Sequence, residues 1–312
     1  MAAMTTQVRA AAYGGPEVLT ITEESAPVPG PGEVLVEVRA AGVNQADMKV
    51  YSGVWGTDPA KLPIPLGFEV AGVVTAVGDD VTGHAVGDEV IAHPVRGGYA
   101  TDVVAPVRTV VAKPAGLDWP EASGLMLTGT AAAHAVTAVD LGAGDTVLVH
   151  GAAGGVGLVA VQLAVLRGAR VVGTAAPSQH DLLRELGAVP VTYGDGLLDR
   201  VRAAAPDGID AALDLAGTDE ALDVSLAVVA ERGRIATIAN FDRGPREGIR
   251  VLGAGGEEGK EIREAAAPEL AELAATGRLR VFVEATFPLT EVVAAHELLA
   301  SRRASGKIVL LP

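Results

Sequence analysis

The stretch HGAAGGVG, residues 150–157, is the part of the chain whose residue types and spacing point most directly to chemistry. It nearly matches the G-x-G-x-x-G pattern that holds the pyrophosphate of a dinucleotide. Ala152 stands where the first glycine belongs, and alanine fits there if its φ angle is negative. The alternative is a tight turn in a glycine-rich protein, so the context of the loop must decide.

The segments on either side of this loop favour a dinucleotide site. A buried strand is predicted at 147–149, and an almost wholly apolar helix from Leu158 to Arg167 follows the loop. Gly168 ends that helix, and the apolar segment RVVGT then begins a second strand. A glycine-rich loop inside such a β-α-β unit is the setting in which the pattern binds a nucleotide.

Individual loop residues have separate roles in the predicted site. Gly154 lets the backbone approach a pyrophosphate, and Gly157 lets the helix pack closely on the preceding strand. Free N–H groups around Gly155 and Val156, at the start of the helix, face the phosphate anions. The predicted cofactor-binding loop therefore runs from Ala153 to Gly157.

The end of the second strand predicts NADP(H) as the cofactor. Thr174 stands where NAD-selective proteins place a carboxylate on the ribose 2′-OH, and no acidic residue occurs before Asp181. A 2′-phosphate therefore meets no repulsion there. Ser178 is expected to cap the next helix and to donate to that phosphate, with His180 as a further donor. The alternative is that Ser178 only caps its helix.

Composition excludes several other functions. The 312-residue chain has a net charge of −15 and no basic cluster, so nucleic acid and anionic membranes are poor partners. The absence of cysteine excludes disulfides, thiol catalysis and thiolate-bound zinc. The sequence shows neither an apolar run of about 20 residues nor a signal-peptide core, so we expect a soluble cytoplasmic protein.

The elements that must position the loop change in character along the chain. In the first third, Val34, Val36 and Val38 alternate with polar residues, and short strands with glycine turns predict a small β barrel or sandwich. From about residue 120, strand and helix patterns alternate, which predicts an α/β fold with a doubly wound parallel sheet. Asn240 ends one of these strands, at the edge where ligands gather.

Three further local predictions concern the later part of the chain. Asp214 ends a buried strand and is expected to order the local turn. A helix is predicted to begin at Pro268 and to stop before Gly277. Another helix is predicted to begin near the cap Thr290, before a last strand, GKIVLLP.

Seven segments occur in an order that resembles one family. They are AGVNQAD (41–47), GFEVAGVV (67–74), VGDEV (86–90), GGYA (97–100), LTGTAA (127–132), VLVHGAAGGVG (147–157) and GKIVLL (306–311). Together they resemble the zinc-independent, zeta-crystallin-like quinone oxidoreductases of the medium-chain dehydrogenase/reductase superfamily. The resemblance implies a GroES-like β domain at 1–122, a Rossmann NADP-binding domain at 123–261, and a segment at 262–312 that returns to the first domain. It also implies a dinucleotide between the domains and a homodimer.

The same resemblance bears on metal chemistry. Zinc-dependent relatives carry Cys and His where this chain has Asn44 and Phe68, so we predict no metal site. Oxidation of a metal-bound alkoxide is then disfavoured. Hydride delivery to an activated acceptor, such as a quinone or an enone, needs only orientation and hydrogen bonds to a developing oxyanion.

The resemblance also assigns residues near the reacting groups. It places Asn44 on the nicotinamide ribose, although Asn44 could instead be a turn residue. Asp47 is a candidate catalytic residue or a helix cap. Tyr51 is a candidate proton donor or substrate clamp, and Tyr51→Phe is expected to lower turnover about tenfold if Tyr51 donates to the developing oxyanion. However, this chain reads MKVYSG where relatives read TYIRSG, and Tyr51 could instead have no chemical role.

The remaining assignments concern the cofactor. Thr128 resembles a threonine near the nicotinamide carboxamide, and Tyr193 resembles a tyrosine that reaches the 2′-phosphate. Lys307 matches a position close to the cofactor, with an exposed lysine at a strand start as the alternative. His134 is expected to be a packed helix residue.

The leading functional prediction is an NADPH-dependent quinone or enone reductase. One alternative is a C=C reductase of 2-enals or enoyl thioesters, and another is a non-catalytic NADPH-binding protein. A screen of NADPH turnover across these acceptors separates them.

Overall fold

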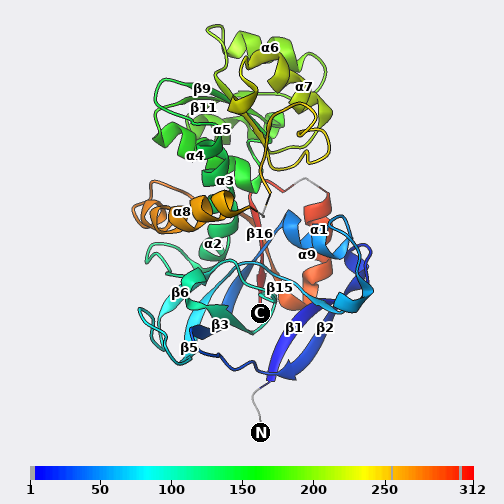
Figure 1. Ribbon diagram of the computed structural model, residues 1–312, viewed down its shortest axis with the longest axis vertical. Coiled ribbons are helices and arrows are strands. Elements are labelled where there is room, and N and C mark those ends of the chain that lie inside the picture. Colours follow the sequence, from blue (N-terminus) through cyan, green and yellow to red (C-terminus); the bar gives the residue numbers. More distant parts are fainter. Residues whose placement is uncertain (1–3, 254–255, 302–303) are drawn as a thin grey trace. The chain divides into compact units, whose positions relative to one another are not determined.

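The computed structural model describes residues 4–253, 256–301 and 304–312, which form two compact units (Figure 1). The first unit comprises the chain up to Leu127 together with Pro268–Pro312, and the second comprises Thr128–Ala267. Both boundaries fall inside helices, α3 (Met126–Ala138) and α8 (Glu257–Ala275). Among the described residues, none of the helices is both long enough and apolar enough to cross a bilayer.

The first unit is built on two β-sheets. The larger has the strand order β15-β16-β3-β5-β6-β8, with β7 also pairing with β3, and the smaller has the order β2-β1-β4. Their bounds are β1 Met4–Ala10, β2 Leu19–Ser25, β3 Glu33–Val43, β4 Ile64–Pro65, β5 Val70–Val77, β6 Glu89–Ala92, β7 Asp102–Pro106, β8 Val110–Ala112, β15 Val283–Pro288 and β16 Lys307–Leu311. This GroES-like β domain confirms the predicted β-rich first third.

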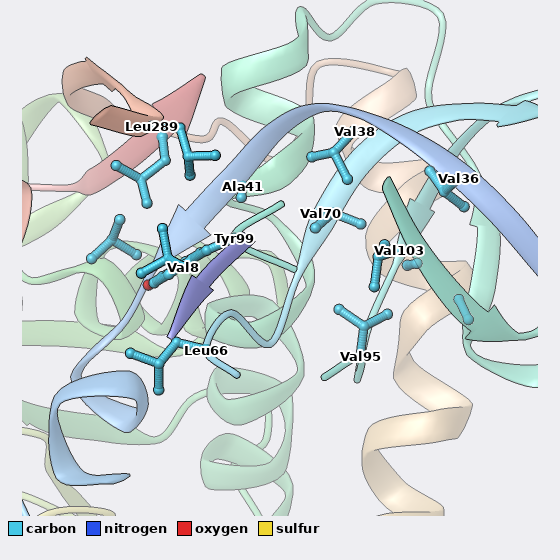
Figure 2. Close-up of a cluster of buried hydrophobic side chains, with 14 of the residues drawn as sticks. Val8, Val36, Val38, Ala41, Leu66, Val70, Val95, Tyr99, Val103 and Leu289 are labelled. Atoms are coloured by element: carbon cyan, nitrogen blue, oxygen red, sulfur yellow. The ribbon is translucent and has the colours of Figure 1, made fainter. Parts of the chain in front are cut away.

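Strand β3 links the early and late parts of the chain in this unit. Val34, Val36 and Val38 are buried, as their alternation predicts. At its other end β3 pairs antiparallel with β16, with Val43 opposite Ile308 and Ala41 opposite Leu310. Figure 2 shows part of the apolar core that forms around these strands. The pairing places the C-terminal strand directly beside the start of α1 (Gln45–Tyr51).

The second unit is a parallel sheet with the order β11-β10-β9-β12-β13-β14. The strands are β9 Thr146–His150, β10 Arg170–Thr174, β11 Ala188–Val191, β12 Ala211–Asp214, β13 Ile235–Thr237 and β14 Arg250–Val251. The connecting helices are α4 Gly155–Leu166, α5 His180–Glu185, α6 Leu197–Ala204 and α7 Asp219–Val228. Counted from β9, the order is 3-2-1-4-5-6, which defines a Rossmann fold and confirms the predicted α/β class.

The prediction that a helix begins at Pro268 is wrong. Helix α8 starts at Glu257 and continues through Pro268 to Ala275. The preceding EEGKEIREAAA is rich in good helix formers, and these offset the hydrogen bond that an internal proline removes. The predicted end is confirmed, because Gly277 has a φ of +67° and Arg278 N donates to the Leu273 carbonyl.

Two predicted helix caps are also wrong. Ser178 lies within a 3-10 turn, Pro177–Gln179, and α5 begins after it without a side-chain cap. Thr290 lies in another 3-10 turn, Leu289–Glu291, and α9 (Val292–Ala300) begins after that turn. In both cases a proline, Pro177 or Pro288, opens the 3-10 turn, which moves the start of the α-helix along the chain.

Candidate functional site

The glycine loop joins β9 to α4 in the second unit. Its left-handed residue is Gly151, with a φ of +71°, and Ala152 is not among the residues with positive φ. The tight turn therefore falls one residue earlier than the pattern suggested, which explains why alanine is accepted at 152. Ala152 N donates to the Thr174 carbonyl at 3.0 Å, which ties the loop to the end of β10.

The two glycines at the start of α4 have different neighbours. A Cβ at Gly157 would overlap the Gly151 carbonyl oxygen and the Ala152 backbone, so close packing of the helix requires glycine there. A Cβ at Gly154 would meet only the Gly151 oxygen, at 3.4 Å, which is ordinary contact. The protein itself thus has room for a Cβ at Gly154, beside the start of α4, where the first N–H groups of a helix have no intrahelical partner. This arrangement fits a pyrophosphate.

The end of β10 carries a threonine that faces inward. Thr174 is buried, and its Oγ1 accepts a hydrogen bond from Gly151 N at 3.2 Å and lies 3.4 Å from His150 Nδ1. Thr174 therefore supports the glycine loop. It brings no negative charge to this edge of the sheet, as NADP(H) binding requires.

The predicted 2′-phosphate donors lie on segments that follow β10 and β11. Ser178 is exposed, and His180 Nε2 lies 3.4 Å from the Ala175 carbonyl oxygen. Tyr193 is 56% exposed and comes two residues after Val191, which pairs with Thr174 in the parallel register. The topology thus brings these segments to the same carboxyl edge of the sheet.

A buried ionic cluster lies in the first unit, where β16 meets the start of α1. Lys307 Nζ is 2.6 Å from Glu69 Oε1, 2.6 Å from Asn44 Oδ1 and 3.5 Å from the Val43 carbonyl oxygen. The side chains of Lys307 and Glu69 are 4% and 0% exposed. The alternative of an exposed lysine at the strand start is therefore wrong. The three ammonium protons have three acceptors within the cluster.

Glu69 is the central residue of this cluster, and sequence reasoning missed it. Its Oε1 also accepts from Asn44 Nδ2 at 3.0 Å, and its Oε2 accepts from Leu127 N at 2.8 Å. Burial alone would raise the pKa of Glu69, but Lys307, His93 and the Leu127 N–H group outweigh it and lower that pKa below its usual value. The feature of the sequence that could have identified Glu69 is an acidic residue inside the apolar segment GFEVAGVV.

Asn44 and Asp47 form the start of α1. Asp47 is fully buried, and its carboxylate accepts from Asn44 N at 3.0 Å and from Gly67 N at 2.9 Å. Burial raises the pKa of Asp47 to about 7 against these stabilising bonds. The capping role of Asp47 is thereby confirmed, and its catalytic role stays a prediction. The Asn44 amide is oriented by Lys307 on its oxygen and by Glu69 and the Gly42 carbonyl on its nitrogen.

Tyr51 is placed differently from a substrate-facing residue. It is 1% exposed, and its hydroxyl lies 3.1 Å from Nδ1 of His296 in α9. Burial raises the pKa of Tyr51 and lowers the pKa of His296 to about 4, so both members of this pair are neutral near pH 7. This geometry favours the alternative of a packed tyrosine. His296 was not identified from the sequence.

The other predicted residues have local roles in the second unit. Asp214 accepts from Gly217 N at 2.8 Å and from the Thr237 hydroxyl at 2.8 Å, so its turn-ordering role is confirmed. Asn240 Oδ1 accepts from Arg243 N at 3.2 Å, and Thr128 is buried near the start of α3. His134 is buried, with Nδ1 3.0 Å from Arg263 Nη1, which agrees with a packed helix residue.

Nothing in the described part of the chain groups three or more His, Asp or Glu side chains as a metal would need. Phe68, at a position where zinc-dependent relatives have a ligand, uses its carbonyl oxygen to accept from Val95 N at 3.0 Å.

A GroES-like domain combined with a Rossmann domain defines the medium-chain dehydrogenase/reductase class. Residues 30–140 match the alcohol dehydrogenase GroES-like domain family, and residues 186–310 match a zinc-binding dehydrogenase family. The chain is 36% identical to a quinone oxidoreductase of Pseudomonas aeruginosa, over 99% of this chain and 100% of that protein. It is 32% identical to human quinone oxidoreductase, over 97% of each chain. It therefore belongs to the quinone oxidoreductase family.

Solved structures agree with this membership. A mycobacterial protein complexed with NADPH has a TM-score of 0.87 at 31% identity, covering 99% of this chain and 100% of that one. Escherichia coli quinone oxidoreductase complexed with NADPH has a TM-score of 0.87 at 27% identity, covering 98% and 100%. The CurK enoyl reductase has a TM-score of 0.88 at 28% identity, covering 98% and 99%.

Proposed function

We propose that this protein is an NADPH-dependent reductase of quinones or activated enones that works without zinc. The observation that carries the proposal is the glycine loop, which has room for a Cβ at Gly154, on a Rossmann sheet with no acid at the end of β10. NADPH-bound relatives of the same fold support the choice of cofactor.

The residues present fit this cofactor, which supplies a hydride when bound. Residues Ala153 to Gly157 hold the pyrophosphate with backbone N–H groups. Hydrogen bonds to the 2′-phosphate come from Ser178, His180 and Tyr193. Asn44, Thr128, Asn240 and Lys307 are the further proposed contacts. The ionic cluster holds the Asn44 amide in one orientation before any ligand arrives, which lowers the entropic cost of using it.

Reduction without a metal sets a limit on the acceptor. A quinone or an enone accepts a hydride without Lewis-acid help, because the charge that develops on its oxygen is delocalised and needs only hydrogen-bond donors. A simple ketone or alcohol lacks that advantage. We therefore expect the substrate to be a conjugated carbonyl compound.

The deciding experiment measures NADPH oxidation with a panel of benzoquinones, naphthoquinones, enones, 2-enals and 2-enoyl thioesters. We expect the largest kcat/KM with a quinone or an enone. Tight NADPH binding with no turnover on any acceptor would instead make the protein a non-catalytic NADPH binder.

A second candidate function is reduction of the C=C bond of 2-enals or enoyl thioesters. The fold match to an enoyl reductase favours it. A kcat/KM at least tenfold higher for a 2-enoyl thioester than for every quinone would select this function.

The assembly and location of this protein are further proposals. We propose a cytoplasmic homodimer, acting on small molecules and not on nucleic acid or membranes. Light scattering at micromolar concentration tests the dimer.

A further inference from the structure

One arginine holds the loop that follows β11. Arg200 in α6 donates from Nε to the Thr192 carbonyl, from Nη1 to the Asp195 carbonyl and from Nη2 to the Gly194 carbonyl, each at 2.8 Å. The planar guanidinium presents these N–H groups in a fixed fork. Three bonds to one short turn therefore fix the path of its backbone.

A second helix holds the same loop from its amide side. Glu220 in α7 accepts a hydrogen bond from Gly194 N at 3.0 Å. Gly194 and Gly196 have φ angles of +90° and +79°, so the turn adopts a conformation that other residues rarely adopt. Because Asp195 and Gly196 are exposed, hydrogen bonds and not apolar burial define this loop.

The clamped loop carries Tyr193, which is 56% exposed. Its strand ends beside β10, since Val191 pairs with Thr174. In a dinucleotide-binding sheet, the end of the second strand receives the adenosine ribose. A phenol on a rigid backbone can donate to a phosphate there with little loss of conformational entropy.

We propose that Arg200 is a positioning residue for cofactor choice, which holds the 192–196 loop so that Tyr193 contacts the 2′-phosphate of NADPH. Arg200 acts through the loop backbone and not as a direct partner of the phosphate. The inference rests on the proposed NADPH-dependent function and adds a specificity element to it.

The experiment compares dissociation constants for NADPH and NADH, measured by quenching of tryptophan fluorescence. Arg200→Lys keeps the charge but loses the fork, and Tyr193→Phe removes the hydroxyl. Each is expected to raise the Kd for NADPH about tenfold and to change the Kd for NADH less than twofold. The double variant should have a Kd for NADPH no higher than that of the weaker-binding single variant, because both changes remove the same contact between Tyr193 and the phosphate.

Arg202→Lys is the matched control, since Arg202 lies exposed on the same helix. It should leave both constants unchanged. The proposal is wrong if Arg200→Lys leaves the ratio of the Kd values for NADPH and NADH unchanged, which includes equal weakening of the binding of both cofactors. It is also wrong if Tyr193→Phe changes neither Kd. It is also wrong if the two substitutions are additive. Failure of the wild-type protein to bind either cofactor would instead overturn the proposed function.

Discussion

At the scale of single residues, the structure separates side chains that face inward from those left at a surface. Four polar residues are all buried in the first unit: Tyr51, Asp47, Glu69 and Lys307. The sequence suggested catalytic roles for Tyr51 and Asp47 and a cofactor contact for Lys307. Their charges and hydroxyls have partners within the protein. The first effect of Asp47, Glu69 and Lys307 is therefore to fix Asn44 at the start of α1, whereas Tyr51, at the end of α1, pairs with His296 of α9.

Tyr51→Phe should affect stability more than turnover. The substitution leaves Nδ1 of buried His296 without its partner, so we expect the free energy of unfolding to fall by about 1–3 kcal/mol. Because the hydroxyl points to His296, kcat should stay within about twofold. Urea unfolding and steady-state kinetics measure the two effects. A tenfold loss of kcat with unchanged stability would restore the proton-donor role.

Glu69→Gln should be strongly destabilising. It leaves the Lys307 ammonium buried without a counter-charge, which costs about 3–5 kcal/mol. Adding Lys307→Met removes that unpaired charge, so the double variant should recover part of the loss. Urea unfolding of both variants tests this. A cost below about 1 kcal/mol for Glu69→Gln would show that the ion pair does not hold the cluster.

At the scale of elements, the glycine loop and α4 show that glycine occupies two positions of one motif for different physical reasons. Gly157 is required by the packing of α4 on the loop backbone, whereas at Gly154 the protein has room for a Cβ. The packing of the protein therefore explains the glycine at 157 but not the glycine at 154, for which we propose contact with the cofactor.

This difference predicts opposite outcomes for two alanine variants. Gly157→Ala should lower Tm strongly, because its Cβ overlaps backbone atoms that cannot yield cheaply. Gly154→Ala should stay within about 1 kcal/mol of wild-type stability, and its Kd for NADPH should rise at least about tenfold. Thermal unfolding and fluorescence titration measure both. Tight NADPH binding by Gly154→Ala would remove the loop from the site.

At the scale of the whole molecule, two buried histidines connect stability to pH. Burial lowers the pKa of His150 and of His296 to about 4. In the unfolded chain these groups titrate near pH 6.5, so between about pH 6.5 and 4 the unfolded state binds more protons. Each histidine therefore contributes stability above pH 6.5 that is lost as the pH falls through 4, about 3 kcal/mol at most.

Asp47 acts in the opposite direction, since its raised pKa makes it contribute stability at low pH that is lost as the pH rises through about 7. Asp47 is present in both the wild type and a histidine variant, so comparing their free energies of unfolding isolates the contribution of the histidine. His296→Gln stays neutral throughout, so its free energy of unfolding should fall less than that of the wild type between pH 7.5 and 5. Equal slopes would contradict the lowered pKa of His296.

The purified protein should contain no functional zinc. Cysteine is absent, and Asn44 and Phe68 occupy two positions where zinc-dependent relatives place ligands. Elemental analysis should find far less than one zinc per chain, and chelators should leave NADPH turnover unchanged. One zinc per chain with chelator-sensitive activity would contradict this prediction.

The sequence by itself determined the fold class, the glycine loop and the lack of an acid after β10, because strand and helix periodicities and loop glycines are local features. Helix starts predicted from the sequence at Pro268, Thr290 and Ser178 were wrong. A longer helix begins before Pro268, and 3-10 turns next to a proline precede the helices after Thr290 and Ser178. The tertiary structure decided the Lys307–Glu69–Asn44 cluster, the Tyr51–His296 pair and the Arg200 clamp. In the first two, strand pairing or helix packing joins residues more than 200 positions apart. In the third, Arg200 follows its loop closely, but its three bonds depend on a left-handed turn that sequence spacing does not reveal.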